Sequence, residues 1–233
     1  MTLVQADLSR LLQAPSPILC VDTCSVLDIF REPTRETFDA NDASAVCSLV
    51  DACKNSLAHC LVAEQVRNEF AEHEAHIEAA AVKNLANFHK NISHVHGLAL
   101  AFGSVGTLDV SSTQGLVSLA RAFSDQLMSC GTTLLTTNDV ALRAVTRMGH
   151  PKTPARKGKE SIKDCIVIET YLDAISKLRT AGHSQPAVFI SSNVNDYATV
   201  GGSRLKPDLA AEFAHLKIEY APNMASAKHF LGL

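Results

Sequence analysis

Four acidic residues of this 233-residue chain follow or flank elements that we expect to end at one edge of a sheet: Asp22, Glu69, Asp164 and Asp196. Open parallel α/β sheets bind their ligands just outside the carboxyl ends of the strands. Clustered carboxylates repel one another unless a hard cation neutralises them, and oxygen ligands suit Mg²⁺ or Mn²⁺. The pattern therefore predicts a site for one or two such ions, which can clamp the attacking and leaving oxygens of a phosphoryl transfer.

Asp22 is the most informative of these acids, because it directly follows the apolar run 17–21. The packing of a buried strand does not explain a carboxylate at its end, although Asp22 could also be the N-cap of a helix that starts near Ser25. Glu69 falls in the second turn of the helix expected after the apolar run 58–63 and could also be a solvated helix residue. Glu64, at the start of the same helix, is the alternative to Glu69.

The other two acids lie further along the chain. Asp164 enters a helix whose following residues are almost all apolar, and a buried charge there needs a partner, which could be a metal ion, Lys159 or Lys163. Glu160 lies four residues earlier, on the same helix face if the helix has already begun. Asp196 follows the apolar run 187–190 in a polar cluster and could also form an Asx turn. The prediction rests on the four acids together.

Short apolar runs predict the strands that would position these acids, near 18–22, 58–63, 187–191 and 216–220, with a weaker one near 133–136. Helix-period segments lie between them, at 42–56, 64 to about 90, 115–130, 138–148 and 161–180. This alternation predicts an α/β fold with a parallel sheet and helices on both of its faces. The stretches 97–113 and 149–158 are expected to be loops. We expect a single domain over 1–233 with a helical and loop insertion around 75–130.

The composition is that of a soluble globular protein, with 46% hydrophobic and 19% charged residues. The net charge of −3 argues against a generally basic coat for nucleic acid. The seven cysteines are odd in number and show no C-x-x-C spacing, which indicates free thiols in a reducing cytoplasm. No apolar run approaches 18 residues and the first residues do not resemble an export signal, so neither a membrane span nor export is expected.

A basic segment leads directly into Asp164. It holds seven cations and the single acid Glu160; the cations are Arg143, Arg147, Lys152, Arg156, Lys157, Lys159 and Lys163. Such a segment beside a metal site predicts a track for a phosphate backbone, and the alternative is a solvated surface loop. Aromatic residues make up only 5% of the chain, so recognition of bases by stacking is not indicated.

Four short motifs resemble, in order and spacing, those of PIN-domain nucleases, and most of all the larger bacterial PIN-like proteins with a helical insertion: residues 21–27, 62–70, 163–169 and 189–197. The resemblance implies a three-layer α/β/α sandwich around a parallel sheet of about five strands. It also implies divalent-metal-dependent cleavage of single-stranded or structured RNA, with Mg²⁺ or Mn²⁺ as cofactor and with 5′-phosphate and 3′-hydroxyl products. Many members of the family are toxins of toxin–antitoxin pairs and homodimers are common, so RNA, an antitoxin and a second copy are the implied partners.

The resemblance also implies roles for individual residues. The catalytic residues and metal ligands would be Asp22, Glu69, Asp164 and Asp196, and Thr23, Asn193 and Glu160 would assist them. The fourth motif departs from the family pattern, because Asn193 stands where the family usually has an acid, and Asp196 follows three residues later. This departure favours an alternative, a catalytically degenerate PIN-like module that binds nucleic acid or protein.

Three further alternatives remain. Residues 134–139 also have the appearance of the fourth motif and end in Asp139, but they precede Asp164 and are therefore out of order. A phosphatase with a strand-end aspartate would use Asp-x-Asp, whereas the second position after Asp22 is Cys24. Cys24 itself could be a nucleophile near a helix start, although no positioned histidine can be named for it.

Overall fold

The computed structural model describes residues 2–150, 152–155, 161–199 and 204–233. Its centre is a five-stranded, all-parallel sheet in the order β3-β2-β1-β4-β5. The strands are β1 (Ile18–Val21), β2 (His59–Ala63), β3 (Thr132–Leu134), β4 (Ala187–Ile190) and β5 (Ile218–Ala221). Every residue of β1, β2 and β4 is buried, as expected for parallel strands covered on both faces. The predicted α/β class and the five strands are confirmed.

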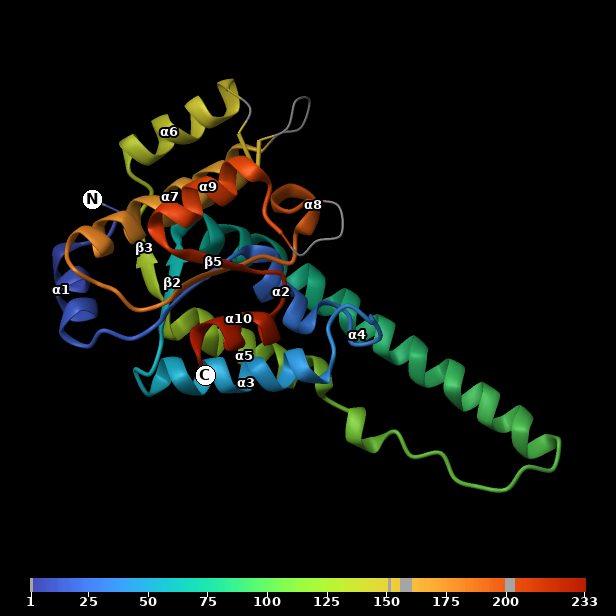
Figure 1. Ribbon diagram of the computed structural model, residues 1–233. Coiled ribbons are helices and arrows are strands. Elements are labelled where there is room, and N and C mark those ends of the chain that lie inside the picture. Colours follow the sequence, from blue (N-terminus) through green and yellow to red (C-terminus); the bar gives the residue numbers. More distant parts are fainter. Residues whose placement is uncertain (1, 151, 156–160, 200–203) are drawn as a thin grey trace.

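Helices cover both faces of this sheet, which gives the three layers of an α/β/α sandwich (Figure 1). One face carries α6 (Asn138–Gly149), α7 (Ile162–Thr180) and α9 (Pro207–Leu216). The other face carries α3 (Ala40–Lys54), α5 (Leu116–Cys130) and α10 (Met224–Leu231). A further helix, α1 (Gln5–Gln13), lies beside the edge strand β3, where Arg10 Nη2 donates to Thr132 Oγ1 over 2.6 Å.

Each of the three inner strands leads into a helix that begins directly after it or just beyond it, at the carboxyl edge of the sheet. They are α2 (Thr23–Arg31) after β1, α4 (Glu64–Ala101) after β2 and α8 (Val194–Tyr197) after β4. The register pairs Val21 with Ile190, so β1 and β4 end side by side. This topology brings the residues that follow the two central strands to the same place.

The hydrophobic core lies on both faces of the sheet and is centred on β4. The Phe189 ring contacts four aromatic rings with centroid separations between 5.2 and 6.5 Å, those of Tyr171, Tyr197, Phe213 and Tyr220. On the opposite face the Arg121 guanidinium stacks on Phe30 and Phe70 and pairs with acids of α4 and α5. The first cluster joins α7, α8 and α9 to β4 and β5, and the second joins α2, α4 and α5 to one another.

Predicted boundaries differ most from the structure in two places. The helix predicted from 64 to about 90 continues to Ala101, into the predicted loop 97–113, because one exposed glycine, Gly97, costs only about 1 kcal/mol in a helix whose neighbours are good helix formers. The predicted strand 216–220 begins two residues later, at Ile218, since Leu216 is the end of α9 and Lys217 has a left-handed backbone with φ 53°.

The 38-residue helix α4 extends well past the sheet, and the segment after it returns to α5 (Figure 1, green). This returning segment contains the short 3₁₀ helix η1 (Ser111–Thr113). In the described part of the chain, no helix combines the length and the apolar character needed to cross a membrane.

Candidate active site

Asp22 lies at the carboxyl end of β1 and is only 3% exposed. It occupies the N-cap position of α2, but its side chain makes no capping hydrogen bond to any described residue. Its Oδ2 instead accepts a hydrogen bond of 2.6 Å from Ser191 Oγ, at the end of the adjacent strand β4. The carboxylate is therefore turned toward the edge of the sheet, and helix capping does not explain it.

The pKa of the Asp22 carboxyl is raised to about 7. Burial is the largest cause, and the charges of Asp164 and Glu69 raise the pKa further. The hydrogen bond from Ser191 acts in the opposite direction. Asp164 and Glu69 thus lie near enough to Asp22 for their charges to affect its pKa, in agreement with the expected clustering of these three acids.

Glu69 lies on α4 and is held by two neighbours. Thr23 Oγ1 donates to Glu69 Oε2 over 2.8 Å, and Gln65 Nε2 donates to Oε1 over 3.0 Å. A half-buried carboxylate with both oxygens bound is not a freely solvated helix residue. The alternative acid, Glu64, accepts from the backbone N–H of Thr136 over 3.0 Å and so connects α4 to the segment after β3.

Asp164 lies on α7, seven residues before Tyr171 and hence on the same side of the helix. The Tyr171 hydroxyl donates to Val21 O over 2.5 Å and accepts from Ala63 N–H over 3.1 Å. This tyrosine fastens α7 across the ends of β1 and β2. Asp164 lies about 10 Å from Tyr171 along the axis of α7, toward the start of the helix. Because α7 starts beyond the ends of β1 and β2, Asp164 lies outside the carboxyl edge.

Asp196 is 2% exposed and lies in the short helix α8 after β4. Its Oδ2 accepts a hydrogen bond of 2.6 Å from Asn193 Nδ2. The neighbouring Tyr197 hydroxyl is buried, and its pKa is raised by burial first and then by the charges of Asp22, Asp164 and Asp196 among others. The charges of three of the four predicted acids therefore act on the same hydroxyl.

Ser191 was not predicted as a functional residue, although it lies within the predicted fourth motif. It is fully buried, and its Oγ both donates to Asp22 and accepts from Asn193 N–H, over 3.2 Å. The available signal was its position, since a hydroxyl directly after a buried parallel strand lies where ligands bind. Of the predicted helpers, Thr23 and Asn193 lie at this edge, and Glu160 lies outside the described residues.

The donor chemistry of this edge fits a hard divalent cation. The side chains that meet at this edge offer oxygen atoms as ligands. Burial and the nearby negative charges raise the pKa of Asp22 and so disfavour its ionised form, and a bound cation would stabilise that form. In the described part of the chain, however, no three His, Cys, Asp or Glu side chains are arranged as a ready metal-binding group. Magnesium sites often use one or two carboxylates and complete their coordination with water and substrate phosphates.

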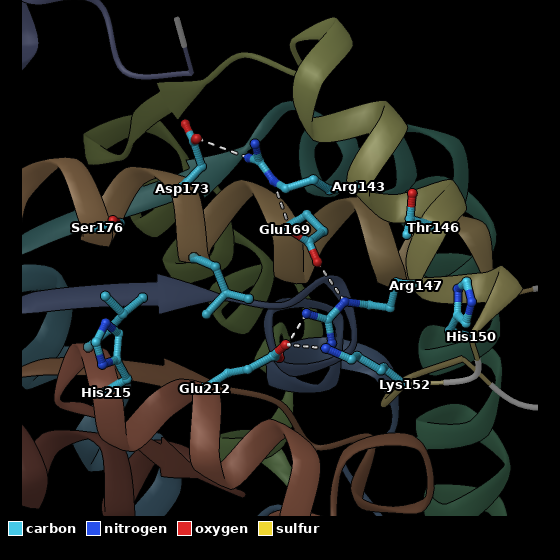
Figure 2. Close-up of a pocket in the computed structure, with 12 residues that line it drawn as sticks. Arg143, Thr146, Arg147, His150, Lys152, Glu169, Asp173, Ser176, Glu212 and His215 are labelled. Carbon is cyan, nitrogen blue, oxygen red and sulfur yellow. Dashed lines mark hydrogen bonds and ion pairs between the residues drawn. The ribbon is translucent and has the colours of Figure 1, made fainter.

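The cations of the predicted basic track that lie among the described residues form ion pairs, and Figure 2 shows those of Arg143, Arg147 and Lys152. Arg147 is 4% exposed, and its guanidinium binds Glu169 and Glu212 over 2.7 Å each and Thr153 O over 2.6 Å. Arg143 binds Glu169 and Asp173 over 3.0 and 2.9 Å. This geometry corrects the interpretation of Arg147 as a substrate contact, because its donors hold α6 against α7 and α9.

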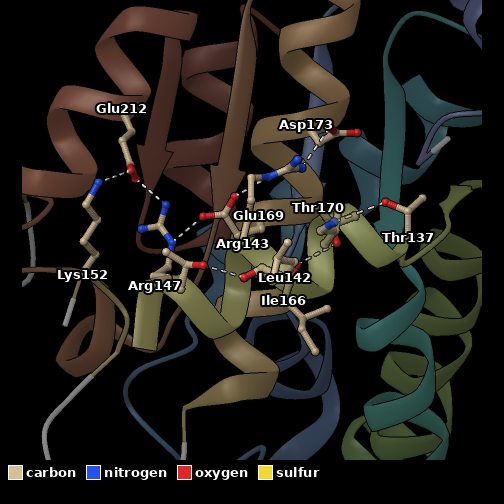
Figure 3. A network of polar contacts seen from close by, with 12 residues as sticks. Thr137, Leu142, Arg143, Arg147, Lys152, Ile166, Glu169, Thr170, Asp173 and Glu212 are labelled. Atoms are coloured by element: carbon tan, nitrogen blue, oxygen red, sulfur yellow. Dashed lines mark hydrogen bonds and ion pairs between the residues drawn. The ribbon is translucent and has the colours of Figure 1, made fainter. Parts of the chain in front are cut away.

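These ion pairs form one network that spans three helices (Figure 3). A pocket of about 710 Å³ lies over it, lined by residues of α6, α7 and α9, and none of the four predicted acids lines that pocket. Of the remaining cations, Lys152 lies 3.7 Å from Glu212, while Lys163 is 54% exposed and lies 3.3 Å from Glu72. Arg156, Lys157 and Lys159 lie outside the described residues.

Two alternatives from the sequence lose support. Asp139 is exposed in the first turn of α6, after the edge strand β3, and Thr137 caps that helix through its side chain. Burial, followed by the charges of Asp22 and Asp28, raises the pKa of the Cys24 thiol well above its usual value. That shift suppresses the thiolate that a nucleophilic cysteine needs.

Comparison with known families agrees with this arrangement. The family model for the PIN domain matches residues 19–197, a span that begins in β1 and ends at the last residue of α8. No curated protein and no solved structure gives a significant match to the chain. The matched span includes all four predicted acids, and PIN domains are generally nucleases. From the match, the sheet topology and the acidic carboxyl edge, we conclude that this chain belongs to the PIN-domain family.

Proposed function

We propose that this chain is a divalent-metal-dependent endoribonuclease that hydrolyses phosphodiester bonds in RNA. The observation that carries the proposal is the buried Asp22 at the carboxyl edge of a PIN fold, whose pKa is raised to about 7 by burial first and then by the charges of Asp164 and Glu69. Three acids that interact electrostatically at a ligand-binding edge are suited to a hard cation and a phosphate.

The proposed cofactor is Mg²⁺ or Mn²⁺, which would neutralise the carboxylates and lower the pKa of a water that attacks phosphorus. Asp22 and Asp164 are its central proposed ligands, with Glu69 and Asp196 beside them. Ser191 orients Asp22 through the 2.6 Å hydrogen bond, as Thr23 orients Glu69 through one of 2.8 Å. Partners of this kind fix the direction of ligand oxygens and contribute to metal affinity.

For the substrate we propose contacts to phosphates rather than to bases. Lys163 is exposed and directly precedes Asp164, so its ammonium can exchange the exposed Glu72 for an RNA phosphate. Arg156, Lys157 and Lys159 remain part of this proposal on sequence grounds. Arg143, whose side chain is 43% exposed, is a weaker candidate because two carboxylates already bind it.

A second function, a PIN-like module that binds nucleic acid or protein without cutting, has specific support. The amide of Asn193 stands where the family usually has an acid, and the described residues contain no preassembled group of three ligands. Titration with Mn²⁺ separates the two functions, because a degenerate site shows no saturable binding. A toxin paired with a protein antitoxin would be a narrower form of the nuclease proposal.

The test of the nuclease proposal uses a labelled single-stranded RNA, Mn²⁺ and three proteins: the wild type, Asp22→Asn and Asp139→Asn. The third is a matched control, since Asp139 is an exposed aspartate that follows the edge strand of the same sheet. We expect cleavage by the wild type and by the control, and none by Asp22→Asn or in the presence of EDTA. Circular dichroism checks that all three proteins fold.

Full cleavage by Asp22→Asn would contradict the proposal, because the variant keeps the shape of the side chain and removes its charge. Saturable Mn²⁺ binding without cleavage would mean that the RNA offered is not the substrate, and a library of structured RNAs is then the next probe. No saturable Mn²⁺ binding to the wild type would favour the non-cutting module.

A further inference from the structure

Three cysteines, Cys53, Cys60 and Cys130, lie together at the edge of the sheet opposite to the candidate active site. Cys53 is in the last turn of α3, which leads into β2, and Cys130 is the last residue of α5, which leads into β3. The two helices pack against each other on one face of the sheet (Figure 1). Because both helices end where a strand is about to begin, the cysteines lie at the amino edge, away from Asp22.

Cys53 and Cys130 are in direct contact. Their side chains are hydrogen-bonded to each other, and Cys53 is the donor when Cys130 is ionised. Beside this pair, Lys54 Nζ donates to Gln126 Oε1 over 2.6 Å and so also joins α3 to α5. In its protonated form the Cys130 thiol donates to Leu127 O over 3.3 Å. Two thiols that touch between packed helices can be joined by a disulfide through rotation of their side chains.

The residue that follows Cys130 is held tightly against β2 and α4. A Cβ atom added to Gly131 would lie only 2.4 Å from Val62 Cγ2, so this close approach requires a glycine. Arg67 of α4 donates from Nη2 to Gly131 O over 2.8 Å, while its Nε–H is buried and has no hydrogen-bond partner among the described residues. The Arg67 guanidinium is thereby fixed near the thiols, and its charge acts on Cys60 and Cys130.

These surroundings make the three thiols chemically different. The hydrogen bond from Cys53 is the largest cause that lowers the pKa of the Cys130 thiol, and partial burial opposes it. The charges of Lys54 and Arg67 lower the same pKa further and offset the negative end of the α5 dipole. The hydrogen bond to Cys130, and then burial, raises the pKa of Cys53 well above its usual value, and burial does the same to Cys60. Cys130 is therefore the thiol of this cluster that ionises first.

The exposure of the thiols favours the same pair. Cys53 and Cys130 are half-buried, whereas Cys60 is only 1% exposed. A small oxidant can therefore reach the first two. A partly exposed thiol of lowered pKa beside a second, resolving thiol is the arrangement that oxidants convert into a reversible disulfide. Disulfides of this transient kind also form in reducing compartments.

We propose that Cys130 and Cys53 are a site of reversible oxidation by hydrogen peroxide, in which Cys130 attacks the peroxide and Cys53 then closes a disulfide. In the first step the Cys130 sulfur bonds to one peroxide oxygen and the O–O bond breaks. The departing hydroxide takes up the proton that Cys130 has lost and becomes water, which leaves a sulfenic acid on Cys130.

In the second step the Cys53 sulfur attacks the Cys130 sulfur and the S–O bond breaks. The hydroxide that leaves combines with the thiol proton of Cys53 to form a second water. Two electrons have then passed from the two thiols to the peroxide. The first step also removes the negative charge of Cys130, and with it the main cause that keeps the pKa of Cys53 high.

The disulfide would join the end of α3 to the end of α5 and close the loop 53–130, which contains β2 and α4. It would lie at the amino edge, whereas the predicted acids lie at or beyond the carboxyl edge. The proposal therefore does not depend on whether the protein cuts RNA.

The test treats the reduced, full-length chain with hydrogen peroxide, blocks the remaining thiols and maps linked peptides by mass spectrometry. We expect a link between Cys53 and Cys130 as the first product, with loss of two of the seven thiols and full recovery in dithiothreitol. The matched control is Cys47→Ser, because Cys47 is another half-buried cysteine of α3. This control should form the link at the wild-type rate, and circular dichroism checks that each protein folds.

Two variants assign the roles within the pair. In Cys53→Ser the serine hydroxyl can still donate to Cys130, so peroxide should leave a sulfenic acid on Cys130 that dimedone traps. In Cys130→Ser we expect neither the disulfide nor a dimedone adduct on Cys53, because the pKa of Cys53 is raised by its burial as well.

A wild type that keeps all seven thiols in peroxide would overturn the proposal, as would a first disulfide between any other two cysteines. Dimedone adducts on Cys53 but not on Cys130 would overturn the assigned roles. Loss of the link in Cys47→Ser would also overturn the proposal, because a cysteine outside the pair would then be required.

Discussion

Asp22 is the residue on which the candidate site depends, and its environment explains both its position and its chemistry. It follows the central strand β1 and is 3% exposed, and burial, followed by the charges of Asp164 and Glu69, raises the pKa of its carboxyl to about 7. A carboxyl with that pKa is only partly ionised at neutral pH. Cation binding would therefore be coupled to loss of a proton from this residue.

The pKa of Asp22 predicts how stability depends on pH. The folded-state pKa of about 7 lies above the ordinary 3.8, so between these values the folded chain holds a proton that the unfolded chain has lost. The contribution of Asp22 to the stability of the metal-free protein therefore falls as pH rises through this window. Asp22→Asn removes that loss, and its stability relative to the wild type should rise by about 2–4 kcal/mol between pH 4 and pH 8.

Urea denaturation of both proteins in EDTA, at both ends of this pH window, measures the effect. A difference in stability that is the same at both pH values would contradict the environment assigned to Asp22. Addition of Mn²⁺ near pH 8 should stabilise the wild type more than the variant, because only the wild type regains a charged ligand.

A second prediction concerns Ser191, the hydrogen-bond partner of Asp22. Ser191→Ala removes the 2.6 Å hydrogen bond that favours the ionised form of Asp22, so the pKa of Asp22 should rise further. We expect Mn²⁺ affinity to fall about 10–100-fold, as for partners that orient metal ligands, and the acid limb of cleavage to move to higher pH. Ser191→Thr should restore both. Ser192→Ala is the neighbouring control, and an equal effect in that variant would contradict the role of Ser191.

At the scale of elements, the carboxyl edge is assembled by helices that are fastened to strand ends. Tyr171 on α7 bonds to the ends of β1 and β2, and Thr23 of α2 bonds to Glu69 of α4. On the face of the sheet that carries α7, Arg147 ties α6 to α7 and α9 through Glu169 and Glu212.

The network around Arg147 predicts a loss of stability rather than of substrate binding. Arg147→Met would leave Glu169, whose side chain is 9% exposed, with the partly exposed Arg143 as its one ion-pair partner among the described residues. Removing one partner of a buried ion pair costs about 3–5 kcal/mol. We expect that loss in urea denaturation, with an unchanged KM for RNA. The comparison variant Lys163→Ala should keep its stability and raise the KM. A stable Arg147→Met protein with a raised KM would restore the interpretation made from the sequence.

The contrast between these two cations shows what the sequence could predict. Asp22, its strand and the parallel sheet follow from local patterns, since an apolar run that ends in a carboxylate is visible in a few residues. The partners of Arg147 are not visible in this way, because Glu212 lies 65 residues further on and meets it only through packing of α9 beside α7. Likewise α4 continues beyond Gly97 because the helix propensity of the neighbouring residues outweighs the cost of one glycine.

At the scale of the whole molecule, the chain consists of a compact sandwich and a projecting arm, residues 82–116, formed by the distal part of α4 and the segment that returns from it. The sequence predicts an insertion around 75–130, and we propose that this insertion is confined to the arm. The Arg121 side chain bonds Glu74 and Glu78, so α5 runs antiparallel to α4 with Val117 close to Ala81. Two residues this close can be joined by a short loop.

Excision of the arm therefore makes a prediction. Replacing 82–116 by a short Gly/Ser loop should leave the melting temperature within a few degrees of the wild-type value, because no buried residue is removed. The shortened chain should keep the nuclease activity proposed for the wild type. A shortened protein that does not fold would show that the arm is part of the folding unit.

The most direct test of the proposed metal site is the position of Mn²⁺ in crystals grown with that ion, located by anomalous scattering. We expect an anomalous peak within ligand distance, about 2.0–2.5 Å, of carboxylate oxygens of Asp22 and Asp164. We also expect this peak to disappear in crystals of Asp22→Asn. The proposed site would be contradicted if the protein cleaves RNA but its crystals hold Mn²⁺ only elsewhere, for example at the Glu169 and Glu212 carboxylates.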